Sequence, residues 1–329
     1  MHFPKTDIPY LSRDGVWRNV KNLFSPYVRE LFPLHDDMQV TAHLSSLVNF
    51  APFIEPLFNT LAPTHICEIG SLAQVTTTYL YRLAGNFDAK LDCVDPTVNV
   101  QQCQKNFPGI HCFPMKSQEY FAASPEVANI YMIDGDHNYD VLFMELNAVD
   151  SLSANSDKAV CMFLHDTGWP WAVYDGFYQP DEARRADEII KEKCLSLFTD
   201  IPVEDGMYFR NLGIIPKKDN DKVGTRTALM DFLRTSCRSW KHVFIPSIFG
   251  CSVVWLEDNL DEAQKVEFAK LSAIIEQLSP FLSLLELNRL FLCQNYSIAT
   301  EVQMKIREAD SKSLWRKLTR SLGKMLGKS

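Results

Sequence analysis

Two short apolar segments, each ending abruptly in carboxylates and an imidazole, most constrain how this chain can fold. The first runs from residue 131 into Asp-Gly-Asp-His at 134–137, and the second runs from residue 160 into His-Asp at 165–166. Apolar runs of this length, closed by polar groups, are typical of buried strands in a parallel sheet. In open α/β sheets the ligand binds at the carboxyl ends of the strands. The two segments therefore predict one cleft lined by acids, histidines and candidate metal ligands.

Strand-like and helix-like segments alternate from about residue 64 onwards. Parallel strands are expected at 65–70, 90–95, 110–115, 131–134 and 160–165, and the clearest helices between them at 73–83 and 140–152. Later antiparallel strands are expected within 206–216 and 251–257, followed by helices over 261–278 and 280–292. This order predicts an α/β fold with a doubly wound, mostly parallel Rossmann-like sheet, N-terminal helices and a helical C-terminal extension.

Length and composition fit one large domain with additions at both ends. The chain has 329 residues, of which 46% are hydrophobic, enough for a sizeable core. We expect an N-terminal helical segment over 1–60, the Rossmann-like domain over 61–258 and the helical extension over 259–329. The net charge of −8 argues against nucleic acid as a partner. The nine cysteines form no Cys-x-x-Cys pair, which favours a reduced, cytoplasmic protein.

The segment 311–329 differs from the rest of the chain. It contains no acidic residue, has apolar residues at helical spacing, and carries six basic residues: Lys312, Arg316, Lys317, Arg320, Lys324 and Lys328. A basic amphipathic helix is typical of a peripheral anchor on an anionic membrane surface, which would place the protein at the inner face of the membrane. The alternative is a helix that packs its apolar stripe on the main domain. The sequence leaves both a monomer and a homo-oligomer open.

The turn after the first expected strand narrows the choice of cofactor. Residues 68–77 match neither G-x-G-x-x-G nor G-x-x-x-x-G-K-[ST], so a pyrophosphate cradle is not indicated. S-adenosylmethionine has no phosphate, and needs a turn that lets its methionine portion approach the backbone near a helix N-terminus. Asp95, at the end of the second expected strand, can accept hydrogen bonds from both ribose hydroxyls.

Four motifs then occur in a fixed order. They are Glu-x-Gly at 68–70, an aspartate at 95, Ile-Asp-Gly-Asp-His-x-Tyr at 133–139 and His-Asp-Thr-x-Trp-Pro at 165–170. In this combination the chain resembles class I S-adenosylmethionine-dependent methyltransferases, and most nearly the family 24 type, related to the cephalosporin hydroxylase and macrocin O-methyltransferase group. The segment Gly-x-x-Thr-Ala-x-x-Asp-Phe-Leu at 224–233 resembles a later part of that family. The match covers about residues 60–258.

The resemblance implies a Rossmann-like methyltransferase sheet that binds S-adenosylmethionine and methylates a hydroxyl of a sugar, glycan or related small molecule. The implied cofactor-binding residues are Glu68, Gly70, Ser71, Asp95, Ser117 and Asp134. The chain departs from the family at Gln74, where a second glycine is usual, so the Gln74 side chain could intrude on the cofactor or contact it. The aromatic residues that follow Trp169-Pro170 would suit stacking on a sugar or a lid over the acceptor, or simply loop packing.

Methyl transfer to a hydroxyl requires orientation of the acceptor and removal of its proton. His137 and His165 are the candidate bases, His137 before His165, because imidazole titrates near neutrality. Asp134 is expected to act with them. Asp134, Asp136 and Asp166 could hold Mg²⁺ or orient the histidines. Each histidine could instead be a structural residue that hydrogen-bonds loop backbone.

Two other functions remain open from the sequence. His137, His165 and one aspartate could form a two-histidine, one-carboxylate site of a non-haem iron oxygenase, although Glu68 and Asp95 would then lack a role. Alternatively, Gln74 marks a degenerate cofactor pocket, and the protein is a methyltransferase-like scaffold that docks on membrane through 311–329.

Overall fold

A computed structural model of the chain describes most of the predicted domain and extension. The described residues are 46–71, 74–179, 186–191, 193–199, 203–204, 206–208, 212–216 and 222–325. Their side chains are described up to 299, except at 208, and at 302–303. Within the predicted N-terminal helical segment, the short helix η3 (Leu47–Phe50) leads directly into α4 (Ala51–Leu61). The rest of that segment, 1–45, lies outside the described residues.

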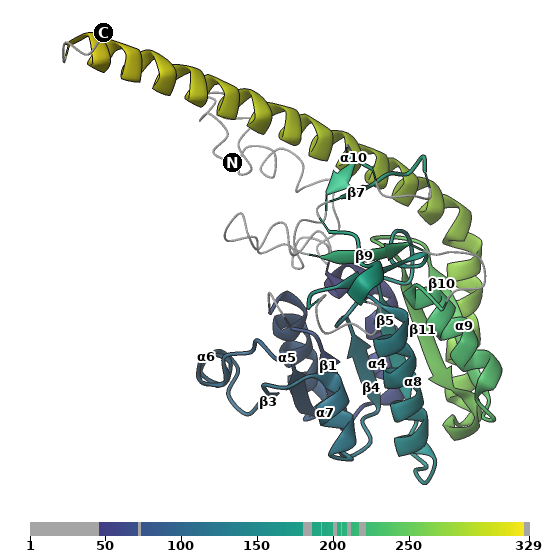
Figure 1. Cartoon of the computed structure of the whole chain (residues 1–329). Coiled ribbons are helices and arrows are strands. Elements are labelled where there is room, and N and C mark those ends of the chain that lie inside the picture. The colour runs from purple at the N-terminus through teal and green to yellow at the C-terminus, as the bar shows by residue number, and fades with distance from the viewer. Residues whose placement is uncertain are drawn as a thin grey trace, which may run out of the picture.

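A seven-stranded sheet forms the centre of the molecule (Figure 1), in the order β10-β11-β5-β4-β1-β2-β3. Its strands are β1 (His65–Ile69), β2 (Lys90–Val94), β3 (His111–Phe113), β4 (Ile130–Ile133), β5 (Cys161–His165), β10 (Trp240–Ile245) and β11 (Cys251–Leu256). Strands β1 to β5 pair in parallel, and β11 pairs antiparallel with both β5 and β10. The predicted fold class, a doubly wound and mostly parallel Rossmann-like sheet, is confirmed.

Helices cover both faces of this sheet, which explains why its inner strands read as continuous apolar runs. Successive strand residues point to opposite faces: in β4, Ile130 and Met132 pack in one core cluster, whereas Tyr131 and Ile133 pack in the other. The first cluster includes residues of α4, α5 (Val75–Phe87), α6 (Val100–Asn106) and α10 (Glu262–Met325). The second includes residues of α7 (Ser117–Ala122), α8 (Tyr139–Ser153) and α9 (Thr225–Thr235).

Two small antiparallel pairs belong to the segment between β5 and α9. β6 (Tyr174–Phe177) pairs with β9 (Gly213–Pro216), and β7 (Cys194–Leu195) pairs with β8 (Met207–Tyr208). The expected strand region 206–216 is therefore divided between two separate pairs, while 251–257 corresponds to β11 of the main sheet. Two further short helices are η5 (Ala186–Glu188) and η6 (Glu257–Asn259).

The helical C-terminal extension is confirmed, but as one helix instead of two. α10 runs from Glu262 to Met325, so the expected interruption between 278 and 280 is wrong. Pro280 lies inside the helix, where it removes one backbone hydrogen bond but leaves the neighbouring turns intact. α10 runs along one side of the domain, and its C-terminal end projects well beyond it (Figure 1). The side chains of the predicted basic tail, and all of 326–329, lie outside the described residues. The predicted domain boundaries stay predictions.

Candidate active site

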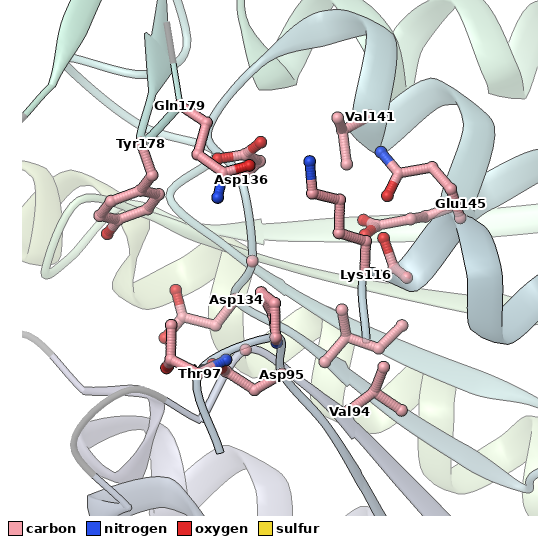
Figure 2. Close-up of a pocket in the computed structure, with 16 residues that line it drawn as sticks. Val94, Asp95, Thr97, Lys116, Asp134, Asp136, Val141, Glu145, Tyr178 and Gln179 are labelled. Atoms are coloured by element: carbon pink, nitrogen blue, oxygen red, sulfur yellow. Dashed lines mark hydrogen bonds between the residues drawn. The ribbon is translucent and has the colours of Figure 1, made fainter. Parts of the chain in front are cut away.

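A pocket of about 190 Å³ lies at the carboxyl ends of the first four strands. The turns after β1, β2, β3 and β4 each contribute to its wall, together with α8 and the loop that follows β6. Sixteen residues line it (Figure 2): Ile69, Gly70, Val94, Asp95, Pro96, Thr97, Lys116, Ser117, Gln118, Asp134, Gly135, Asp136, Val141, Glu145, Tyr178 and Gln179. Parallel strands bring these ends together although they lie far apart in the sequence.

The structure brings four of the six residues implied for cofactor binding to this pocket: Gly70, Asp95, Ser117 and Asp134. The other two, Glu68 and Ser71, are buried and are absent from the described lining. The Ser71 backbone N–H donates to the Asp95 Oδ2 at 2.8 Å, so Ser71 supports a lining residue. Gln74 precedes α5 with a φ of +54° and is likewise absent from the described lining.

Position 70 requires glycine because the turn after β1 packs directly against the backbone at the end of β4. Its φ is +87°, and a Cβ placed there would lie 2.1 Å from the Asp134 carbonyl oxygen. Only glycine adopts this conformation at no steric cost. Its absent side chain lets the turn approach the backbone of the β4 end, as the pocket geometry requires.

The Asp95 carboxylate is fixed at the pocket wall by hydrogen bonds from its own turn and from the turn after β1. Oδ2 accepts from the Ser71 N–H, and Oδ1 accepts from the Thr97 N–H at 2.7 Å and the Thr97 hydroxyl at 2.6 Å. An ionised carboxylate has about four lone-pair sites. The three hydrogen bonds fix the orientation of the Asp95 carboxylate and still leave it able to accept a hydrogen bond from the diol of a ligand.

His165 is buried at the end of β5 and bonded through both ring nitrogens. Nε2 donates to the Ile248 carbonyl oxygen at 3.0 Å, and Nδ1 lies 3.0 Å from Asp134 Oδ1 and 3.2 Å from Asp166 Oδ2. A carbonyl only accepts, and the carboxylates favour a proton on Nδ1. Burial alone lowers the pKa of His165, but the charges of Asp166 and Asp134 outweigh it and raise this pKa well above its ordinary value. His165 is therefore held as an imidazolium.

His137 differs from His165 because only one of its ring nitrogens is engaged. Its Nε2 is hydrogen-bonded to Asp166 Oδ2, whereas its buried Nδ1 has no hydrogen-bond partner among the described residues. Burial lowers the pKa of His137, but Asp166 raises it above the ordinary value. The His137 ring centroid lies 5.6 Å from that of Tyr178, which lines the pocket. An imidazole oriented by a carboxylate, with its second nitrogen free, is the arrangement of a general base.

The candidate metal ligands are arranged differently from the predicted set. Ligand atoms of Asp134, His137 and Asp166 all lie within 4.8 Å of one another. Asp136, which belongs to the predicted set, is not part of this cluster; it lines the pocket, and burial raises its carboxyl pKa. Mg²⁺ prefers oxygen ligands, whereas an imidazole is a usual ligand of divalent transition metals. Two carboxylates and an imidazole therefore suit a divalent transition metal better than Mg²⁺. Binding of Mg²⁺ at these aspartates stays a prediction.

The iron alternative needs both histidines as ligands, and the geometry of His165 does not fit that role. A histidine ligates through a nitrogen lone pair. Nε2 of His165 donates to a backbone carbonyl, and Nδ1 lies between two carboxylates. Neither nitrogen has a lone pair to offer while these bonds persist.

Two buried glutamates have no hydrogen-bond partner for either carboxyl oxygen among the described residues. They are Glu68, at the end of β1, and Glu145, which reaches the pocket from α8. Burial raises the pKa of each to about 8, so both are protonated near neutral pH. Sequence reasoning missed Glu145, although it carries a signal: it interrupts the apolar stripe formed by Leu142, Leu146 and Val149.

α10 is linked to the active site through Glu286, which sequence reasoning also missed. Its carboxylate accepts from the backbone N–H groups of Ile248 and Phe249 at 2.7 and 2.9 Å. The Ile248 carbonyl in turn accepts from His165. Ile248 and Phe249 have φ values of 49° and 63°, in the left-handed region that side chains other than glycine rarely adopt. Arg289 pairs with Glu286 and lies over the Phe249 ring at 4.3 Å.

The chain is similar to solved structures of methyltransferases. The SAH-bound Podospora anserina methyltransferase PaMTH1 is 12% identical with a TM-score of 0.40, and the match covers 74% of this chain and 86% of that one. Human N-acetylserotonin methyltransferase in complex with SAM is 10% identical with a TM-score of 0.37, over 77% of this chain and 60% of that one. The plantazolicin methyltransferase BamL, in complex with SAH, is 10% identical with a TM-score of 0.35, over 77% and 86%. No family model and no curated protein matches the chain. The functional conclusion below therefore rests on the site itself.

Glu145→Gln should stabilise the protein more at pH 8 than at pH 5. The folded-state pKa of Glu145 is raised to about 8 from 4.5, so between these values the folded state binds more protons than the unfolded state. The free energy of unfolding therefore falls as the pH rises, and Glu145 accounts for a loss of about 4 kcal/mol at pH 8. Glutamine has the same shape and no charge. Urea unfolding at the two pH values measures the difference. The exposed Glu276→Gln variant serves as control, and a pH-independent effect of Glu145→Gln would show that Glu145 is ionised in the folded protein.

Gly70→Ala should destabilise the turn after β1 and distort the pocket. The added Cβ would clash with the Asp134 carbonyl and occupy a positive φ, so we expect a loss of about 2–4 kcal/mol. Gly85→Ala is the control, because a Cβ there meets no atom within 4 Å and alanine favours the interior of α5. Equal unfolding midpoints for the two variants would contradict the assigned packing of Gly70.

Proposed function

We propose that the protein is an S-adenosylmethionine-dependent O-methyltransferase that acts on a hydroxyl of a sugar, glycan or related small molecule. The observation that carries this proposal is the convergence of Gly70, Asp95, Ser117 and Asp134, from four consecutive strand ends, on one pocket. The resemblance of the four motifs to family 24 methyltransferases, and the order of the seven strands, support the same reading.

The residues present fit the cofactor. Gly70 lines the pocket without a side chain, so the turn after β1 offers backbone that the methionine portion can approach. Asp95 is held with spare acceptor capacity for the ribose hydroxyls. The bound cofactor would supply an electrophilic methyl group on a positively charged sulfur. The adjacent carboxylate of Asp134 places negative charge on the same wall of the pocket.

The residues of the chain would supply orientation and proton removal. Asp166 holds His137 through Nε2, so that Nδ1 would accept the proton of an acceptor hydroxyl. His165, as an imidazolium, keeps Asp134 and Asp166 in place without acting as a base. Tyr178 is half-exposed at the pocket and would face the acceptor. Its aromatic ring supports a sugar acceptor, since such rings stack on sugar faces.

Asp95→Asn should weaken binding of S-adenosylmethionine by about 10- to 100-fold, because charge-assisted hydrogen bonds contribute roughly 1.5–3 kcal/mol. Isothermal titration calorimetry on the full chain measures this, with the exposed Asp88→Asn variant as control. Absence of binding by the folded wild-type chain at millimolar ligand would refute the proposed cofactor. Stoichiometric iron after anaerobic purification, together with absent binding, would favour the oxygenase alternative.

His137→Ala should leave cofactor affinity within a few-fold of wild type but lower methyl transfer by about 10²- to 10⁴-fold, the usual contribution of a general base. Transfer of labelled methyl from S-adenosylmethionine to a panel of sugars and glycans measures the rate. His111→Ala, a half-exposed histidine on β3, is the matched control. Undiminished transfer by His137→Ala would refute the assigned base, and transfer to none of the panel would refute the sugar acceptor.

A further inference from the structure

The outward side of α10 between residues 278 and 292 is broadly apolar. Seven large hydrophobic side chains here are exposed, and we call them the apolar face: Leu278, Phe281, Leu284, Leu285, Leu287, Phe291 and Leu292. Phe198, 71% exposed, extends this face from the neighbouring loop and contacts the Phe291 ring edge-on at 6.3 Å. Exposed apolar surface of this extent marks a site of association with another surface.

The other side of α10 packs on the sheet, which fixes how the helix can meet a membrane. By length and composition alone, the stretch 262–299 could cross a bilayer. However, Phe268, Leu271 and Ile275 are buried in the main core, and Glu286 bonds the loop beside the active site. A helix anchored in this way can lie along an interface but cannot span it.

The breadth of the apolar face favours lipid over a second copy of the helix. A two-stranded coiled coil uses a narrow seam of two positions in seven, flanked by charged residues. Leu284 and Leu285 are adjacent and so point about 100° apart, which makes the face wider than such a seam. The only charged residues between 278 and 292 are Glu286 and Arg289, and these pair with each other at 2.6 Å. No charge is left on this stretch to specify a partner helix.

Charge complementarity identifies the kind of lipid. α10 continues without interruption to Met325, so the apolar face is followed on the same helix by residues 311–325 of the basic segment 311–329. That segment carries six basic residues and no acidic one in a chain of net charge −8. We propose that the apolar face and the basic segment dock together on an anionic lipid bilayer, with α10 in the plane of the interface. The protein would then be peripheral at the cytoplasmic leaflet, with its pocket close to membrane-borne acceptors.

Flotation of the full chain with vesicles tests this proposal. Wild type should bind vesicles containing about 30% phosphatidylglycerol and should bind pure phosphatidylcholine at least about tenfold less. Leu284→Glu/Leu287→Glu should reduce binding to the anionic vesicles about tenfold or more, because it places charge in the apolar face. Val266→Glu is the matched control: Val266 is exposed on the same helix but lies outside 278–292. Arg316→Glu/Lys317→Glu should remove the preference for anionic lipid.

Three results would overturn the proposal. The first is wild type that fails to bind anionic vesicles, and the second is binding that survives the double leucine substitution. The third is a dimer in light scattering that the same substitution converts to a monomer without any vesicle binding, since a second copy would then cover the apolar face. Thermal unfolding of each variant confirms that it is folded.

A separate observation concerns Glu145, whose side chain reaches the pocket without a partner. It is only 1% exposed and lines the pocket from α8 together with Val141 (Figure 2). Neither of its carboxyl oxygens has a hydrogen-bond partner among the described residues. A buried polar group normally has a hydrogen-bond partner, so the Glu145 carboxyl group is free to bind a ligand atom. The other charged residues that line the same pocket are Lys116, Asp95, Asp134 and Asp136.

The chemistry of a neutral carboxyl identifies what it would bind. Its C=O accepts one hydrogen bond and its O–H donates another, side by side. The edge of adenine presents the matching pair, an exocyclic amine that donates and a ring nitrogen that accepts. Resting on the proposed function, we infer that Glu145 recognises the adenine edge of the bound cofactor and thereby selects a 6-aminopurine nucleoside. Burial raises the pKa of this carboxyl to about 8. The carboxyl is therefore protonated at neutral pH, as this pairing requires.

Calorimetry with S-adenosylhomocysteine tests the assignment. Glu145→Gln, whose amide offers the same acceptor and donor, should bind within about threefold of wild type at pH 7. Glu145→Leu should bind about 10- to 100-fold more weakly. Above pH 8 the wild-type affinity should fall, because the carboxylate loses its donor, whereas that of Glu145→Gln should not. The analogue lacking the 6-amino group should bind wild type more weakly than the parent ligand, but bind Glu145→Leu equally.

Wild-type affinity in Glu145→Leu, or an unchanged preference of that variant for the 6-amino group, would refute the role of Glu145 while leaving the proposed cofactor intact. Failure of wild type to bind S-adenosylhomocysteine at all would refute the proposed function, and this assignment with it.

Discussion

The imidazolium of His165 holds the ends of β4 and β5 together, and the rest of the site depends on it. These strands end in Asp134 and Asp166, two carboxylates that would repel one another if nothing positive lay between them. His165 Nδ1 lies within 3.0 and 3.2 Å of them. Its other nitrogen donates a hydrogen bond to the Ile248 carbonyl, and Glu286 accepts a hydrogen bond from the Ile248 N–H. α10 is thus connected, through the turn at Ile248 and through His165, to the acidic ends of β4 and β5.

The same carboxylate, Asp166, meets two histidines and gives them different properties. His165 has both ring nitrogens engaged and carries a fixed positive charge, whereas the buried Nδ1 of His137 has no hydrogen-bond partner among the described residues. Environments that separate otherwise similar titratable groups are how one site assigns structural and acid–base roles. Glu68 and Glu145 extend this contrast, because burial raises their pKa values and keeps them neutral, whereas the two histidines lower the pKa of Asp166 and keep it ionised.

Much of this arrangement could be predicted from the sequence because each buried parallel strand has its own local pattern, an apolar run that ends in polar residues. Apolar runs that end in Gly70, Asp95, Asp134 and His165 indicated both the strands and the edge at which they meet. The features that sequence reasoning missed depend on contacts between distant segments. Edge strand β10 contains Lys241 and His242 and lacks a continuous apolar run. The continuity of α10 through Pro280, and the bond from Glu286 to the turn at 248–249, arise from packing against the sheet, which no local pattern encodes.

The central claim is that four strand ends form a pocket for an adenosyl cofactor, and a crystal structure of the chain with S-adenosylhomocysteine tests it most directly. The account predicts ribose hydroxyls within hydrogen-bond distance of the Asp95 carboxylate, and the methionine portion against the turn at Gly70. A ligand bound elsewhere, or a pocket that stays empty at millimolar ligand, would contradict it.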